Sequence, residues 1–108
     1  MQPNTENNVY GLSANAVEKI RAVLQRHPTI EQAILYGSRA KGTYEEGSDI
    51  DLTLLGKDLN YAELGQIENE LDDLLLPYTI DLSLYEHIAN PDLLVHIKRV
   101  GRVFYQRI

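Results

Sequence analysis

The sequence predicts an α/β (α+β) fold in which a small sheet is covered by helices. Segments whose apolar residues recur at helical spacing alternate along the chain with short strand-like segments. The length of 108 residues supports one domain with a real core. The composition, 44% hydrophobic and 24% charged, is that of a globular protein and not of a disordered chain.

The first half of the chain predicts a helix, a strand and a short helix. We expect a helix from about Ser13 to Arg26, because Ser13 suits an N-cap, apolar residues follow at helical spacing, and the residue before Pro28 disfavours helix. The apolar run 32–36 predicts a buried strand that ends in a Gly-Ser turn. Residues 39–41 are expected to begin a short helix.

Residues 49–55 and 79–85 each alternate between polar and apolar side chains and predict two more strands. Between them, a capping box of Asn60 and Glu63 begins a helix whose apolar face extends to Leu75.

The last helix is expected to open at Asn90-Pro91 and to end near Val100. There Gly101 suits a left-handed C-terminal position. Residues 103–105 are expected to add a short edge strand.

Charge and cysteine content exclude several classes of protein. Ten Lys and Arg stand against sixteen Asp and Glu, for a formal net charge of −6, which argues against direct binding of nucleic acid. The absence of cysteine excludes disulfides, a thiolate zinc site and a cysteine nucleophile. No signal peptide or membrane-spanning run is evident, so we expect a cytoplasmic protein with a flexible segment 1–11 and one domain over 12–108.

The residues that suggest chemistry are two acids on one strand and the turn before it. Asp49 and Asp51 project from one face, with Cα atoms roughly 6.5–7 Å apart. Their carboxylates repel each other unless a cation such as Mg²⁺, which favours hard oxygen ligands, lies between them. Gly37 permits close backbone approach, and the Ser38 hydroxyl and N–H suit a phosphate.

A third acid, Asp81, lies on the third predicted strand. If that strand pairs beside the second, Asp81 joins Asp49 and Asp51. Three carboxylates around two cations about 3.5–4 Å apart form the arrangement used for in-line phosphoryl transfer. Each feature alone has a simpler interpretation: an Asp-x-Asp pair is common, Gly-Ser is often only a turn, and Asp81 suits a solvated edge. Their combination favours catalysis.

The cationic and histidine side chains leave alternatives open. Arg39 and Lys41 could steady a triphosphate or form a solvated helix. The three histidines have no mutual spacing typical of a metal site, and His96 suits packing or the surface. The basic segment from Lys98 to Arg107 suits an acidic partner or the cationic end of a helix.

Gly37-Ser38, ten intervening residues and Asp49-x-Asp51 resemble the signature of the polymerase-beta-type nucleotidyltransferase superfamily, in particular its minimal nucleotidyltransferase (MNT) branch. The resemblance implies a mixed sheet flanked by helices and a single minimal nucleotidyltransferase domain. It implies that Asp49, Asp51 and Asp81 are the catalytic residues and ligands of two Mg²⁺ ions. It also implies ATP as substrate, bound by Gly37, Ser38 and Arg39.

The resemblance further implies a protein partner. Minimal nucleotidyltransferases act as antitoxins by transferring AMP from ATP to a tyrosine of a HEPN-domain toxin. We expect a chain of this length to lack the second domain that holds the acceptor in larger relatives. This expectation fits a protein acceptor and allows homo-oligomers or hetero-oligomers with the toxin. The alternatives are a non-catalytic antitoxin that neutralises its partner by occlusion and a small-molecule nucleotidyltransferase.

Overall fold

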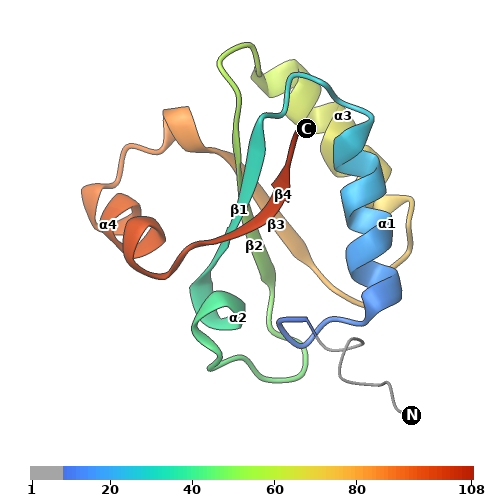
Figure 1. Cartoon of the computed structure of the whole chain (residues 1–108), viewed down its shortest axis with the longest axis vertical. Coiled ribbons are helices and arrows are strands. Elements are labelled where there is room, and N and C mark those ends of the chain that lie inside the picture. The colour runs from blue at the N-terminus through green and yellow to red at the C-terminus, as the bar shows by residue number, and fades with distance from the viewer. Residues whose placement is uncertain (1–8) are drawn as a thin grey trace.

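The structure is a computed structural model that describes residues 9–108, so residues 1–8 of the expected flexible segment lie outside the described part (Figure 1). In chain order the elements are α1 (Ala14–Gln25), β1 (Gln32–Tyr36), α2 (Gly37–Lys41), β2 (Ile50–Leu55), α3 (Tyr61–Asp72), β3 (Ile80–Leu84), the 3₁₀ helix η2 (Tyr85–His87), α4 (Pro91–Val100) and β4 (Arg102–Gln106). This order confirms the predicted sequence of helices and strands.

The four strands form one mixed sheet in the order β3-β2-β1-β4. β1 is antiparallel to both β2 and β4, whereas β2 and β3 are parallel. Figure 1 shows α1 and α3 on one side of the sheet and α4 on the other. The α/β class, the mixed sheet and the strand at the C-terminal edge are therefore confirmed.

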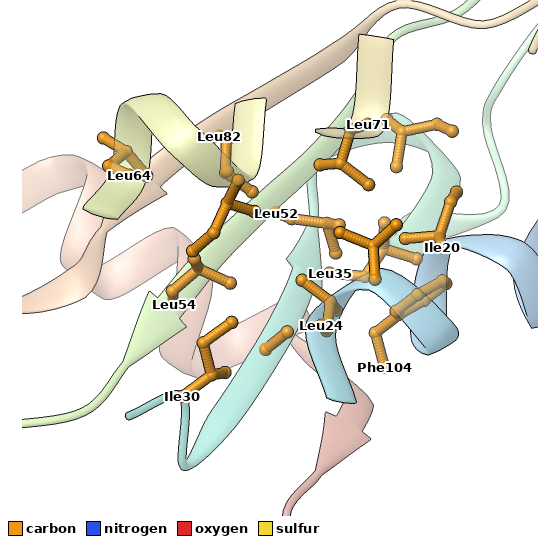
Figure 2. Close-up of a cluster of buried hydrophobic side chains, with 14 of the residues drawn as sticks. Ile20, Leu24, Ile30, Leu35, Leu52, Leu54, Leu64, Leu71, Leu82 and Phe104 are labelled. Carbon is orange, nitrogen blue, oxygen red and sulfur yellow. The ribbon is translucent and has the colours of Figure 1, made fainter. Parts of the chain in front are cut away.

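The hydrophobic core fills the space between the sheet and the pair α1 and α3 (Figure 2). On β2, the alternate residues Ile50, Leu52 and Leu54 are at most 1% exposed and all point into this core. Because side chains alternate along a strand, slipping β2 by one residue would expose all three and bury Asp51 in their place. The apolar pattern therefore fixes which face of the sheet carries the acids.

A buried histidine joins the end of α1 to α3. The His27 side chain contacts two carboxylates, with Nδ1 2.9 Å from Glu63 Oε2 and Nε2 3.1 Å from Glu70 Oε1. Burial by itself lowers the pKa of His27, but its hydrogen bonds to Glu63 and Glu70 outweigh burial, and the net pKa is raised. The two carboxylates therefore favour the protonated form of His27, in which both ring nitrogens can donate.

Two local predictions are wrong. α3 ends at Asp72, and the expected helical face does not continue to Leu75, which adopts φ 55° and is 88% exposed. Gly101 has φ −60°, which is extended and not left-handed. A Cβ at this position would overlap the Ile97 carbonyl oxygen and lie 2.8 Å from Ile34 Cγ2, so close packing of the chain requires glycine there.

The described residues of segment 1–11 form a tight turn, in which Val9 and Leu12 exchange backbone hydrogen bonds. Within residues 9–108, no helix is both long and apolar enough to cross a lipid bilayer.

Candidate functional site

Two of the three predicted acids are direct neighbours on the face of the sheet opposite the core. β2 and β3 pair in parallel with Asp51 beside Asp81, as the sequence led us to expect if these strands were adjacent. Adjacent strands lie about 4.8 Å apart, so the two carboxylates start from neighbouring positions. Asp49 precedes β2 by one residue and is exposed. On its other side Asp51 pairs with Tyr36 of β1, so Tyr36, Asp51 and Asp81 lie in one row across three strands.

The negative charges of Asp81 and Asp49 act on Asp51. The pKa of Asp51 is raised, first by partial burial and then by the negative charges of Asp81 and Asp49. A divalent cation would remove this repulsion, and carboxylate oxygens are the ligands that Mg²⁺ prefers. The residues therefore fit the metal that the sequence predicts.

The three acids do not form a complete set of metal ligands in this structure. Within residues 9–108, no group of three or more His, Cys, Asp or Glu side chains is close enough together to hold a metal ion. Asp51 and Asp81 face the same side, while Asp49 lies before the strand begins. The three-carboxylate site with two Mg²⁺ ions accordingly stays a prediction, in which Asp49 is drawn toward the other two.

The Gly-Ser turn lies directly against one of these acids. Gly37 has φ 77°, in the left-handed region that favours glycine. A Cβ built on Gly37 would overlap Asp51 Oδ2 and lie 3.2 Å from Asp51 Cγ. Only glycine therefore lets the backbone approach the carboxylate this closely. Ser38, the next residue in α2, is half-buried beside this contact.

A histidine from α4 holds the same turn. The Gly37 N–H donates to His96 Nε2 at 3.1 Å. The His96 ring also meets the Tyr36 ring edge-on, with centroids 6.2 Å apart. Sequence analysis assigned His96 only to packing or the surface, and its local sequence carries no signal of this contact. The hydrogen bond depends on how α4 lies over the sheet, 59 residues along the chain from the turn.

Arg39 is used inside the protein. Its side chain is buried, at 2% exposure. Nε and Nη2 donate to the Ser48 carbonyl at 3.1 and 2.9 Å, and Nη1 donates to the Tyr10 carbonyl at 3.0 Å. The guanidinium carbon also lies 5.3 Å from the ring centroids of both Tyr44 and Tyr78. Arg39 thus fixes the loop that leads into Asp49, and its predicted contact with nucleotide stays a prediction.

Tyr36 is a buried phenol next to the acids. Its exposed fraction is 8%, as expected for a core position. The pKa of Tyr36 is raised by burial and by the charges of Asp51 and Asp81, although a hydrogen bond with Ser83 acts in the opposite direction. The phenol therefore remains protonated beside the carboxylates.

Residues 18–108 match the family model described as "Polymerase beta, Nucleotidyltransferase". The fold is similar to a chain of a crystal structure of a toxin–antitoxin with AMP-PNP, with a TM-score of 0.68 and 25% identity, covering 84% of this chain and 73% of that one. It is also similar to a chain of the structure of a tri-AMPylated Shewanella oneidensis HEPN toxin in complex with MNT antitoxin, with a TM-score of 0.64 and 21% identity, covering 87% of this chain and 72% of that one.

One curated relative is much longer than this chain. A segment of the DNA mismatch repair protein MutL of Bacillus cytotoxicus is 30% identical over 94 residues. The match covers 83% of this chain and only 13% of that protein.

The family match spans most of the chain and includes the features described above: the sheet, the Gly-Ser turn and the three acids. The two solved structures share the overall fold at 25% and 21% identity. The chain belongs to the polymerase beta-type nucleotidyltransferase family.

Proposed function

We propose that this protein transfers AMP from ATP to a tyrosine hydroxyl of a HEPN-domain toxin and so acts as an antitoxin. The observation that carries the proposal is the placement of Asp51 beside Asp81, with the Gly37 backbone against the Asp51 carboxylate. The family supports nucleotidyl transfer, and the similar chains in toxin–antitoxin structures with AMP-PNP and with a tri-AMPylated toxin support the nucleotide and the partner.

In this reaction the tyrosine oxygen attacks the α-phosphorus of ATP. The new O–P bond forms as the bond to the bridging oxygen between the α- and β-phosphates breaks, and pyrophosphate leaves with the electron pair. Bound Mg²⁺ would supply charge stabilisation for the phosphates and lower the pKa of the attacking hydroxyl.

The residues of this chain divide the remaining tasks. Asp49, Asp51 and Asp81 would hold the cations, and Ser38 would contact the phosphates next to them. Asp81 is our candidate for taking the tyrosine proton, because it is exposed on edge strand β3, where an incoming protein can approach. Arg39 would act through the loop 43–48, which it ties to the body of the protein.

The experiment uses the purified protein, the HEPN-domain toxin that we expect to be encoded beside it, ATP and Mg²⁺. Mass spectrometry should detect the toxin heavier by one or more AMP units, attached to tyrosine. The double variant Asp49→Asn plus Asp51→Asn should abolish the addition. Asp72→Asn plus Asp73→Asn removes the same charge at the exposed end of α3 and should not affect it. No addition by the unaltered protein would refute the proposal.

The same variants test the two alternative functions. If Asp49→Asn plus Asp51→Asn still protects cells that express the toxin as fully as the unaltered chain, neutralisation works by occlusion and not by AMP transfer. If AMP appears on a small molecule and never on the toxin, the acceptor is not a protein.

A further inference from the structure

His96 of α4 contacts both Gly37 of the Gly-Ser turn and Tyr36, the neighbour of Asp51 in the sheet. We infer that His96 is a positioning residue, which holds the Gly37-Ser38 turn against Asp51 in the geometry that nucleotide binding requires. The inference rests on the proposed function and adds a residue outside the Gly-Ser and Asp-x-Asp pattern.

The His96 ring accepts a hydrogen bond from the turn. The Gly37 N–H donates to His96 Nε2 at 3.1 Å, so Nε2 must carry a lone pair. His96 is therefore neutral in this contact, with its proton on Nδ1. The Gly37 amide is occupied by the protein itself, which leaves the Ser38 hydroxyl and amide as the groups of this turn that can meet a phosphate.

The hydrogen bond from Gly37 to His96 controls the direction of the turn beside Asp51. Gly37 approaches the Asp51 carboxylate so closely that no side chain fits between them, and its φ of 77° is one that few other residues adopt. Gly37 has no side chain of its own that could hold this conformation. The amide bond to His96 fixes its direction from outside, and the His96 ring edge against Tyr36 fixes the ring relative to β1.

The helix α4 is itself anchored next to His96. Ile97, next to His96, is the only residue of α4 with a buried side chain. Gly101, at the C-terminal end of the helix, packs its backbone against Ile97 and Ile34 of β1. The helix therefore brings His96 to the turn on a supported backbone, although half of its residues are exposed.

The test compares two amide side chains at position 96. In His96→Gln, Oε1 is as many bonds from Cβ as Nε2 of histidine, so the acceptor is kept. His96→Asn is one carbon shorter and places its oxygen too close to the helix to reach Gly37. Both variants are polar and uncharged, which makes Asn the matched control for reach.

We expect the KM for ATP to rise about threefold to tenfold in His96→Asn, the effect of losing one hydrogen bond, and to stay within about twofold of the original value in His96→Gln. The KM for the acceptor protein should be unchanged in both. Loss of folded protein alone would lower kcat and leave the KM for ATP unaltered. Equal KM values for ATP in the two variants would overturn the inference.

A second measurement does not depend on activity. Hydrogen exchange of the Gly37 amide, followed by NMR in the protein without nucleotide, should be slow in the unaltered protein and in His96→Gln and faster in His96→Asn. Unchanged exchange in His96→Asn would show that His96 does not hold the turn. If the unaltered protein transfers no AMP, the proposed function fails, and the exchange experiment still decides whether His96 holds the turn.

Discussion

The contact between the Gly37 backbone and the Asp51 carboxylate predicts that Gly37→Ala inactivates the protein for a reason separate from stability. A residue other than glycine in the left-handed region costs about 1–2 kcal/mol. For a domain of this size that corresponds to a decrease in Tm of roughly 4–8 °C for each kcal/mol. In addition, the new methyl group would overlap Asp51 Oδ2, so the carboxylate has to move.

The structure offers a matched control for the backbone strain. Gly42, the residue after α2, has φ 85°, and a Cβ built there meets no atom within 4 Å. Gly42→Ala should therefore lose a similar 1–2 kcal/mol or so of unfolding free energy without disturbing any acid. The difference between the two variants isolates the effect of the methyl group on Asp51.

The assay is AMP transfer to the proposed HEPN-domain partner, together with the unfolding free energy of both variants in urea. A displacement of about 1 Å in a catalytic group can reduce the rate by about 100-fold. We expect Gly37→Ala to lose at least that factor and Gly42→Ala to remain within about threefold of the unaltered protein once both are folded. If the two variants transfer AMP at similar rates, the close approach of Gly37 to Asp51 has no functional role.

Three further predictions concern charge. Folding raises the pKa of Asp51, so its ionised form destabilises the protein above that pKa. Asp51→Asn should therefore raise Tm in EDTA and abolish any increase in Tm caused by Mg²⁺. A lower Tm of this variant in EDTA would contradict the prediction. The pKa of His27 is raised above 6.5, so its contribution to the unfolding free energy is complete below pH 6.5 and is lost as pH rises through the folded-state pKa. Urea unfolding of the unaltered protein between pH 6 and 9 should show this decline. The His27→Gln variant should not show it. Arg39→Met leaves two backbone carbonyls without their donor and should lower the unfolding free energy in urea by about 1–3 kcal/mol or more. An unchanged unfolding free energy would show that the guanidinium does not make these contacts.

The sequence is informative wherever a property repeats along one segment. The alternation of Ile50, Leu52 and Leu54 with polar residues identified both the buried face of β2 and the opposite face that carries Asp51. The N-cap residues Ser13 and Asn60 correctly marked the first turns of α1 and α3, where their side chains accept backbone N–H groups. These features depend on neighbours within a few residues, which a single sequence contains.

The features that sequence analysis missed depend on contacts between distant segments. The contact of His96 with Gly37 spans 59 residues, and the Arg39 contact with Tyr10 spans 29. The early end of α3 is a similar case, because Leu75 suits a helix by composition but has a left-handed backbone in the turn toward β3. Local propensity cannot predict any of these, since the tertiary arrangement decides each one.

The two faces of the sheet have opposite relations to stability. On the core face, substitutions such as Leu52→Ala remove buried contacts and are expected to cost about 2–5 kcal/mol. On the other face, Asp51 and Asp81 are placed side by side, where burial and the negative charge of Asp81 disfavour the ionised form of Asp51 and so oppose folding; a bound cation would relieve this. Variants selected for greater stability should therefore accumulate neutral residues at Asp51 and Asp81. Loss of AMP transfer in such variants would show that these two acids are retained for function.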